Sequence, residues 1–421
     1  MRYLYIALLT MALPFILLRQ WWRARRQPGA FARLGERIGR YPFKMEGAVW
    51  VHAVSVGEVI AAIPLIKALQ AAYAGHPVVV TTMTTTGAAR VKAAFGETVK
   101  HAYLPYDTPG AAHRFLAAIQ PMLGVIMETE IWPNLLLACE QKSVPVCLVN
   151  ARLSEKSAKG YARFGHLTRE TLHRFAFIAC AAESDAKRFI ALGANPKRLS
   201  VSGNIKYDLV VSPNFIAEAI QWRDRGGKRS FVWVAASTHE GEETLILAAH
   251  QRLRAHYPDA LLILVPRHPD RFSTVFAKVE AVFKTERRSL SAQCHRDSAV
   301  YLGDTMGELL FFYAVADVAF VGGSLIPRGG HNILEPAALA KPIISGPHVF
   351  NFETIVADFI EAKALSFVNH TDDLAETLIT FAGHAEQRQQ QGERAFQLME
   401  AKRGVLQRQL GLIKQLVAPT V

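Results

Sequence analysis

The chain has 421 residues, of which 50% are hydrophobic and 20% are charged, and its formal net charge is +12 at pH 7. This composition excludes a disordered chain, and the length exceeds what one hydrophobic core usually organises, so we expect two domains. The positive charge predicts an anionic partner: a nucleic acid, a membrane surface or a phosphorylated substrate. The four cysteines stand singly, with no CxxC pair, which indicates reduced core residues in a cytosolic environment.

The N-terminus combines an apolar stretch with a cluster of basic residues. Tyr3–Leu18 would extend about 24 Å as a helix, against about 30 Å for the hydrocarbon core of a bilayer, and Pro14 would kink it. Trp21 and Trp22 suit the membrane interface, and the basic residues behind them favour a cytoplasmic position for the rest of the chain. These basic residues are Arg19, Arg23, Arg25, Arg26, Arg33, Arg37, Arg40 and Lys44. Because no small-x-small cleavage site follows, we expect residues 1–22 to form an uncleaved membrane anchor or an interfacial helix.

From Val49 onward, short apolar runs alternate with helical patterns, which is typical of βαβ units and predicts parallel sheets in an α/β fold. Strands are expected in the first half at Val49–Val54, Val78–Met83, His101–Leu104, Leu123–Glu128, Val144–Asn150, Phe177–Ala182 and Leu199–Ile205. Strands are expected in the second half at Phe231–Ala236, Leu261–Val265, Val300–Leu302, Val318–Val321, Pro342–Ile344 and Ala364–Val368. The polar stretch from Gln221 to Ser230 is expected to be a linker, and a long terminal helix is expected from about Ala385 to Leu416.

The first candidate catalytic residue follows the run Val49–Val54. Glu58 comes three residues after Ser55 and opens an apolar-periodic stretch that continues to Leu69, which predicts a strand leading into a helix. Since ligands of open α/β sheets bind at the carboxyl ends of the strands, Glu58 is our leading candidate for a catalytic base. The alternative is a first-turn acid favoured by the helix dipole, with Ser55 as the helix cap.

Two further strand ends of the first half offer charged side chains. Glu128 and Glu130 flank one threonine, and paired acids at a strand end are expensive to bury without a function. Glu130 is also a candidate for capping the helix that opens at Pro133. Lys206 follows a turn at the end of the last strand, where a lysine can neutralise a phosphate or a carboxylate. The alternative for Lys206 is an ordinary surface lysine.

Polar segments follow the strands of the second half as well. They are Ser237–Glu242, Pro266–Pro269, Gly303–Glu308, Gly322–Ser324 and Arg328–Pro336. The first can present helix N-terminal amides to a phosphate, and Arg267 in the second lies beside another strand end. The last two form a glycine-rich loop whose amides can approach a pyrophosphate or a ribose, with Glu335 as an acceptor for ribose hydroxyls. Each segment alone could be ordinary turn chemistry, but together they favour a nucleotide site.

Several signatures are absent from the sequence. Neither half contains GxGxxG or GxxxxGK[ST], which disfavours a nicotinamide dehydrogenase or a P-loop enzyme, and the lack of GxSxG disfavours a serine hydrolase. No aromatic-interleaved basic patch points to nucleic acid binding. No HExxH motif or Cys/His spacing typical of a metal site is present, so we expect metal-independent catalysis without a cofactor.

Taken together, these segments resemble the family of Kdo (3-deoxy-D-manno-octulosonic acid) transferases of lipopolysaccharide and lipid A biosynthesis. The similarity covers the N-terminal anchor and six segments in the expected order: His52–Glu58, Met127–Asn134, Gly203–Asp208, Pro266–Pro269, Met306–Glu308 and Gly329–Pro336. It implies a GT-B architecture, in which two Rossmann-like domains face a central cleft. It also implies an inverting glycosyltransferase that moves Kdo from CMP-Kdo to a lipid A precursor of the lipid IVA type.

The resemblance further implies roles for individual residues. Glu58 matches the general base that deprotonates the acceptor hydroxyl, and Glu128 and Lys206 match positions that stabilise the transition state. The implied CMP-binding residues are Pro266, Arg267, Met306, Gly307, Glu308, Asn332, Ile333, Leu334 and Glu335.

The resemblance also implies how the chain is divided and where it works. Residues 1–22 would be the anchor, 23–220 the acceptor-binding domain and 221–421 the CMP-Kdo-binding domain. The anchor would lie in the inner membrane with both domains on the cytoplasmic side, where the basic segment can bind anionic lipid.

Two alternatives remain open beside this family. Another GT-B enzyme, either a UDP-sugar transferase or a nucleotide-sugar epimerase, would share the fold, but an epimerase needs neither an acceptor-side base nor an anchor. A catalytically silent sugar- or membrane-binding protein could use the same scaffold, since fold alone does not establish activity. The presence of Glu58, Glu128 and Lys206 together argues against that second alternative.

Overall fold

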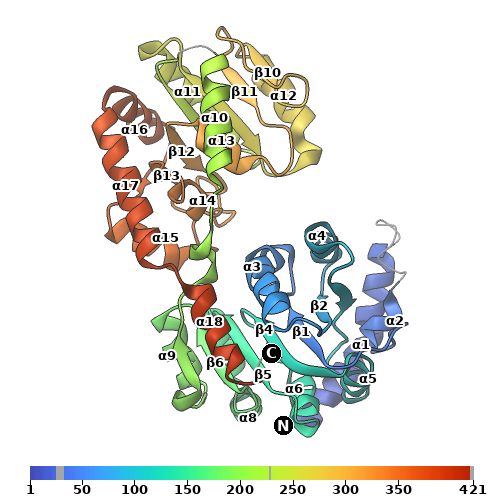
Figure 1. Ribbon diagram of the computed structural model, residues 1–421. Coiled ribbons are helices and arrows are strands. Elements are labelled where there is room, and N and C mark those ends of the chain that lie inside the picture. Colours follow the sequence, from blue (N-terminus) through green and yellow to red (C-terminus); the bar gives the residue numbers. More distant parts are fainter. Residues whose placement is uncertain (25–32, 227–228, 418–421) are drawn as a thin grey trace. The chain divides into compact units, whose positions relative to one another are not determined.

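The computed structural model describes residues 1–24, 33–226 and 229–417. The chain forms two compact units (Figure 1): the first comprises Met1–Asp208 and Gly404–Val421, and the second comprises Leu209–Arg403. Arg25 and Arg26 of the basic segment, and Gly227 and Lys228 of the expected linker, lie outside the described residues.

A parallel sheet forms the centre of the first unit, with seven strands within the described ranges in the order β3-β2-β1-β4-β5-β6-β7. The strands are β1 (Ala48–His52), β2 (Val78–Thr82), β3 (Lys100–Tyr103), β4 (Pro121–Met127), β5 (Val146–Ala151), β6 (Phe177–Cys180) and β7 (Leu199–Val201). The helices that follow or connect them are α3 (Val56–Ala72), α4 (Thr85–Phe95), α5 (Pro109–Ile119), α6 (Pro133–Gln141), α7 (Glu155–Ala162), α8 (Gly165–Leu172) and α9 (Glu183–Ala191), with a short 3₁₀ helix at Ile205–Asp208.

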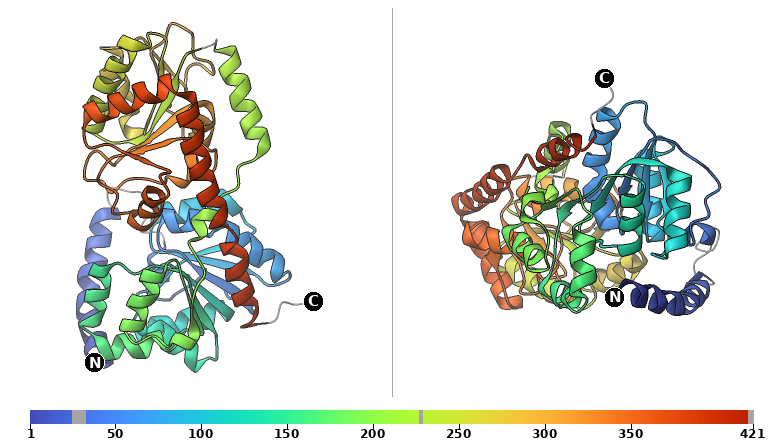
Figure 2. Two further views of the ribbon diagram at one scale, coloured as in Figure 1. Left: turned by 90° about the vertical axis from the view of Figure 1, so that its left-hand side faces the viewer. Right: turned by 90° about the horizontal axis from the view of Figure 1, so that it is seen from below.

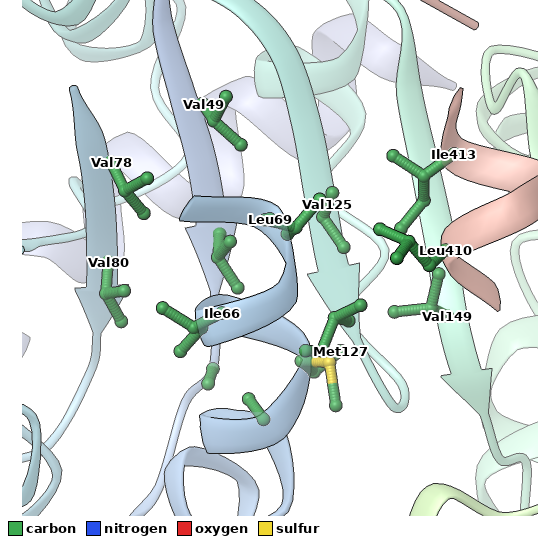
Figure 3. Close-up of a cluster of buried hydrophobic side chains, with 14 of the residues drawn as sticks. Val49, Ile66, Leu69, Val78, Val80, Val125, Met127, Val149, Leu410 and Ile413 are labelled. Carbon is green, nitrogen blue, oxygen red and sulfur yellow. The ribbon is translucent and has the colours of Figure 1, made fainter. Parts of the chain in front are cut away.

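Both faces of this sheet are covered, which explains why its strands are continuous apolar runs. Every residue of β1 is buried, and Val49 and Val51 pack against Ile66 and Leu69 of α3 in one core cluster. Figure 3 shows this cluster, in which Met127 and Val149 of the central strands lie near Leu410 and Ile413. The core therefore joins strands from the start of the chain to a helix at its end.

That last helix, α18 (Val405–Lys414), belongs to the first unit although it closes the sequence. Figures 1 and 2 show it as the dark red helix beside the first sheet, where it contacts α3. Its start is fixed by Asp208, whose carboxylate accepts the N–H of Gly404 at 2.7 Å and the N–H of Leu406. Gly404 has φ of +84°, a conformation that favours glycine and ends the preceding helix.

The second unit repeats the architecture. Its parallel sheet has the order β10-β11-β9-β8-β12-β13-β14 within the described residues. The strands are β8 (Val232–Thr238), β9 (Leu261–Pro266), β10 (Thr285–Arg287), β11 (Val300–Leu302), β12 (Val318–Val321), β13 (Ile343–Ser345) and β14 (Ser366–Phe367). The helices are α10 (Pro213–Arg225), α11 (Glu242–His256), α12 (Phe272–Glu280), α13 (Leu309–Val315), α14 (Leu334–Ala337), α15 (Glu353–Glu361), α16 (Thr371–Gly383) and α17 (Ala385–Ala401).

Two sequence expectations about the organisation of the chain were wrong. The stretch expected as a linker begins inside α10, where Trp222 is buried and Arg223 forms a bidentate ion pair with Asp317 at 2.6 and 2.7 Å. The terminal helix is two helices, α17 and α18, interrupted at Gly404. The second compact unit is residues 209–403, because α18 packs into the core of the first unit, and the functional division into an acceptor-binding and a CMP-Kdo-binding domain stays a prediction.

The N-terminal segment forms a single helix, α1 (Arg2–Ala24), with Pro14 inside it. Within the described residues, its part Arg2–Trp22 is the one helical stretch that is long and apolar enough to cross a membrane. Its first turn is attached to the first unit, because Arg2 Nε donates to Asn134 Oδ1 at 3.1 Å and the Tyr5 hydroxyl donates to Asp107 at 3.0 Å. A short helix, α2 (Leu34–Arg37), follows after the gap in the described residues.

We predict that Asp208→Ala destabilises the first unit by about 1–2 kcal/mol, because two N–H groups at the start of α18 lose their acceptor. Chemical denaturation of the full chain in detergent measures this change. The matched control is Asp224→Ala, which removes an exposed carboxylate from α10. Equal stability of the two variants would show that Asp208 does not hold α18 in place.

Candidate functional site

Glu58 lies in the first turn of α3, immediately beyond the carboxyl end of β1. Its Oε2 accepts the N–H of Val54 at 2.8 Å, and its Oε1 accepts the hydroxyl of Ser55 at 3.0 Å. Ser55 is the N-cap of α3 and also accepts the N–H of Glu58. Both features expected from the sequence therefore occur: Ser55 caps α3, and Glu58 lies at the end of a strand. The hydrogen bonds from Val54 and Ser55 fix the direction of the Glu58 carboxylate.

Burial and a neighbouring charge determine the ionisation of this carboxylate. Burial, followed by the negative charge of Glu128, raises the pKa of Glu58 to about 7, although the hydrogen bonds from Val54 and Ser55 oppose the shift. A carboxylate with a pKa near neutrality is half ionised at physiological pH and accepts protons far better than an ordinary glutamate. Glu58 thus has the electrostatic properties of a general base.

Glu128 and Lys206 lie together, as the sequence motifs implied. Glu128 directly follows β4 with φ of +57°, and its Oε1 is 3.8 Å from Lys206 Nζ. Both side chains are about four-fifths buried, with 22% and 20% of their surfaces exposed. Burial lowers the pKa of Lys206, while the charges of Glu128 and Glu58 act to raise it. The ammonium group of Lys206 therefore lies beside the carboxylates in a partly buried polar site.

Glu130 belongs to this group of charges, which the sequence did not establish. Burial, followed by the charges of Glu58 and Glu128, raises the pKa of Glu130 to about 8. Its expected role as the cap of α6 is wrong: Asp107 accepts the N–H groups of Asn134 and Leu135 at 3.0 and 2.7 Å. Glu58, Glu128, Glu130 and Lys206 together are called the carboxylate cluster below.

In the second unit, the expected nucleotide residues follow the ends of several strands. Pro266 ends β9, and Arg267 after it is exposed, with its backbone N–H bonded to Thr238 O at 3.0 Å. Met306 is 63% exposed, and Gly307 has φ of +88°. Pro266, Arg267, Met306 and Gly307 therefore lie at the carboxyl edge of this sheet.

Glu308 is fixed by a basic residue that the sequence analysis did not identify. Arg288 donates to both of its carboxylate oxygens, with a shortest distance of 2.6 Å, and Thr305 donates as well. These contacts hold the pKa of Glu308 below its usual range, with the hydrogen bond from Arg288 as the largest cause. The carboxylate is thus ionised and rigidly oriented at neutral pH.

The segment that contains Asn332 and Glu335 leads into α14. Asn332 accepts the N–H of Leu334 at 3.2 Å and donates to Glu335 Oε1 at 3.2 Å. Burial raises the pKa of Glu335, and the hydrogen bond from Asn332 and the charge of Arg267 oppose this shift. Ile333 and Leu334 are buried in the core, so a ligand can contact their backbone atoms only. The side-chain oxygens of Glu335 and Asn332 are the acceptors that this segment offers to hydroxyl groups.

The glycine-rich loop differs from its expected role. The N–H groups of Gly323, Ser324 and Leu325 donate to the buried carboxylate of Glu242 at 2.8, 3.1 and 3.1 Å. These amides are therefore occupied by a side chain of the protein and do not face an incoming phosphate. Glu242 opens α11, so the segment expected to supply helix amides supplies the acid that organises the loop.

The described residues contain no group of three or more His, Cys, Asp or Glu side chains arranged to hold a metal ion. The cysteines at 139, 147, 180 and 294 are buried thiols, as the sequence predicted.

The candidate residues of both units have basic neighbours. Lys206 supplies positive charge in the first unit, and Arg267 and Arg288 supply it in the second.

The chain is similar to one family of transferases. The family model described as 3-deoxy-D-manno-octulosonic-acid transferase (kdotransferase) matches residues 32–209. A 3-deoxy-D-manno-octulosonic acid transferase of Haemophilus influenzae is 40% identical over 419 residues, which cover 98% of this chain and 98% of that protein. A protein of the same name from Bordetella pertussis is 40% identical over 366 residues, which cover 83% of this chain and 84% of that one.

The fold has solved relatives at low sequence identity. UDP-GlcNAc 2-epimerase from Neisseria meningitidis, bound to UDP-GlcNAc, has a TM-score of 0.57 and 14% identity, covering 86% of this chain and 100% of its own. A glycosyltransferase from Rickettsia africae has a TM-score of 0.57 and 13% identity over 89% of this chain. These likenesses confirm the predicted α/β fold of GT-B type with two Rossmann-like halves.

We predict that stability falls between about pH 4.5 and pH 8 in part because of Glu130. Over this range the folded protein keeps a proton on Glu130 that the unfolded chain has released, so raising the pH favours unfolding. Glu130→Gln cannot ionise, and its melting temperature should therefore fall less between pH 5 and pH 8.5 than that of the wild type. The control is Glu97→Gln, an exposed glutamate. A pH dependence of Glu130→Gln as steep as that of the wild type would contradict a buried proton at this position.

Proposed function

Since the chain belongs to the family of Kdo transferases and is a glycosyltransferase, we propose that it moves Kdo from CMP-Kdo to a lipid A precursor of the lipid IVA type, with inversion at the anomeric carbon. The single observation that supports this mechanism most is the state of Glu58, an oriented carboxylate whose pKa of about 7 suits a general base. An inverting transfer needs such a base on the side of the sugar opposite the leaving nucleotide.

Glu58 takes the proton of the acceptor hydroxyl as that oxygen attacks the anomeric carbon. The bond between this carbon and the phosphate oxygen breaks, and its electron pair leaves with CMP. Positioned proton transfer of this kind contributes about 10²–10⁴-fold to the rate. Positive charge that develops on the sugar is stabilised by Glu128, and Lys206 offsets negative charge on the phosphate or on the carboxylate of Kdo.

The donor CMP is assigned to the second unit, through Pro266, Arg267, Met306, Gly307, Glu308, Asn332, Ile333, Leu334 and Glu335. Glu335 would accept ribose hydroxyls, and the buried Ile333 and Leu334 would contribute backbone groups. Lys206 in the first unit and Arg267 in the second each supply positive charge, so we propose that the reaction needs no metal ion or cofactor.

The lipid acceptor is assigned to the first unit. A cavity of about 460 Å³ lies there, lined mainly by apolar groups that include Tyr5 of α1, Ile131, Tyr161 and Phe164. The cavity thus lies between Tyr5 of α1 and Ile131, the residue that directly follows Glu130. This position suits an acceptor whose apolar part lies in the membrane and whose sugar hydroxyl reaches Glu58. We therefore propose residues 1–22 as an anchor in the inner membrane, with the two units on its cytoplasmic side.

The basic segment contributes fewer free charges than its sequence implies. Arg33 is paired with Glu36 at 2.6 Å, and the buried Arg37 donates to Met83 O at 2.7 Å and lies 4.1 Å from the ring centre of Tyr103. These two arginines stabilise the first unit. Among the described side chains of the segment, Arg19, Arg40 and Lys44 are exposed and can meet anionic lipid.

We predict that Glu58→Gln lowers the transfer rate by about 10²–10⁴-fold, because the amide keeps the shape of the side chain and cannot accept the proton. The assay supplies CMP-Kdo and a lipid A precursor in detergent, with EDTA present, and measures glycosylated lipid. CMP binding should be unchanged in the variant. An undiminished rate from Glu58→Gln would remove Glu58 from its role as base.

We predict that replacing Arg19, Arg40 and Lys44 together by glutamate raises the KM for acceptor in anionic vesicles several-fold at low salt. The effect should vanish at high salt, where surface charges are screened.

The control replaces three exposed basic residues elsewhere in the same unit, Lys67, Arg90 and Lys197, by glutamate. The role of the basic segment would be refuted by an unchanged KM at low salt, or by an equal effect of the control substitutions.

A further inference from the structure

We propose that His239 and His331, at the ends of two neighbouring strands of the second unit, bind the phosphate group of the donor nucleotide. This inference rests on the proposed function and extends it, because neither histidine belongs to the residues assigned to CMP above.

The two histidines come from adjacent strands of one sheet edge. His239 directly follows β8, and His331 lies in the loop after β12, while β8 and β12 are paired neighbours in the sheet. The Nε2 atoms of the two rings are 2.8 Å apart, and the rings are stacked with 2° between their planes. A third ring, that of His268 after β9, lies edge-on at 5.3 Å from the ring of His239. Three consecutive strands in the order β9-β8-β12 thus each place one imidazole at this edge.

The surroundings of the pair are cationic. Burial is the largest cause that lowers the pKa of His239 to about 4, and His268, Arg328, Arg271 and Arg267 lower it further. Burial followed by His239 and Arg267 lowers the pKa of His331 to about 3. Without a ligand, both rings are therefore neutral at pH 7. Since their Nε2 atoms are 2.8 Å apart, one Nε2–H donates to the Nε2 of the other ring, and an anion that binds both rings replaces this internal hydrogen bond. Arg271 is paired with Glu243, whereas Arg267 and Arg328 are exposed, so neutral N–H donors beside these guanidinium groups favour an anion as a ligand.

The acidic groups near the pair are already occupied. Glu242 accepts the backbone N–H groups of Gly323, Ser324 and Leu325, and Glu335 accepts a hydrogen bond from Asn332. The same contacts remove the loop amides as phosphate donors, although such amides are the usual phosphate ligands after a strand of this fold. The histidine pair lies at the same sheet edge, and its N–H groups can donate to a phosphate where the loop amides cannot.

Gly323 permits this arrangement. A Cβ atom at position 323 would come within 3.1 Å of the His331 ring and 3.4 Å of the His239 ring. Its φ of +68° also favours glycine. The loop that Glu242 organises is therefore shaped to leave space for the two rings.

The placement suits the reaction. When the bond between the anomeric carbon and the phosphate oxygen breaks, the electron pair passes to that oxygen and the phosphate group gains one negative charge. N–H donors and arginines at that oxygen stabilise the charge as it develops. The acceptor proton goes to Glu58, so no further reactant is needed.

The test compares binding of CMP, cytidine and free Kdo by calorimetry at pH 8, where the phosphate is fully ionised. His239→Gln and His331→Gln should each weaken CMP binding about ten- to a hundredfold, the range for losing one hydrogen bond to a charged group, and leave cytidine binding unchanged. His256→Gln, an exposed histidine at the end of α11, is the control and should bind CMP as the wild type does.

Unchanged CMP binding in both variants would overturn the proposal. An equal loss of CMP and cytidine would also overturn it, because it would indicate a structural role for the rings. A loss of Kdo binding with CMP binding intact would assign the pair to the sugar carboxylate instead. Wild-type protein that binds CMP through the pair but transfers no Kdo would contradict the proposed function and leave the phosphate site in place.

Discussion

Burial of neighbouring carboxylates determines the chemistry available to the first unit. Burial is the largest cause of the shifts and repulsion between the carboxylates adds to it, so the pKa values of Glu58 and Glu130 rise to about 7 and about 8. Lys206 Nζ lies 3.8 Å from Glu128 Oε1. Two acids that exchange protons near pH 7 are thus held beside the pair Glu128–Lys206, which is the condition for reversible proton transfer.

The parallel sheet determines where these carboxylates lie. β1 and β4 are paired neighbours, so Glu58 after β1 and Glu128 after β4 emerge at the same edge. Asp208 then follows Lys206 within one short 3₁₀ helix and caps α18, which closes the core beneath β5. Lys206 of the candidate site and Asp208, which fixes the start of α18, therefore lie in the same short segment. In the second unit, the carboxylate of Glu242 likewise fixes the loop beside the histidine pair.

Much of this structure could be predicted from the sequence, because buried parallel strands are unmistakable apolar runs and the first residues after them face ligands. Interactions between distant residues could not be predicted. Asp107 caps α6 from 27 residues away, and Glu242 reaches loop amides more than 80 residues later. The raised pKa of Glu130 depends in part on the charge of Glu58, which comes from another segment. The helix α18 joins the first unit although no local feature of its sequence indicates this. Gly404 was the one available signal that the terminal helix is interrupted.

The measurement that tests the central claim most directly is the pH dependence of kcat/KM for Kdo transfer in the wild type and in Glu128→Gln. With Glu58 as the base, the rate should rise with pH through an apparent pKa of about 7, because the ionised form is active. Removing the charge of Glu128 should shift this pKa downward, because that charge acts together with burial to raise the pKa of Glu58. A rate that is flat between pH 5.5 and 8.5, or an apparent pKa that is identical in the two proteins, would contradict the coupled carboxylate cluster.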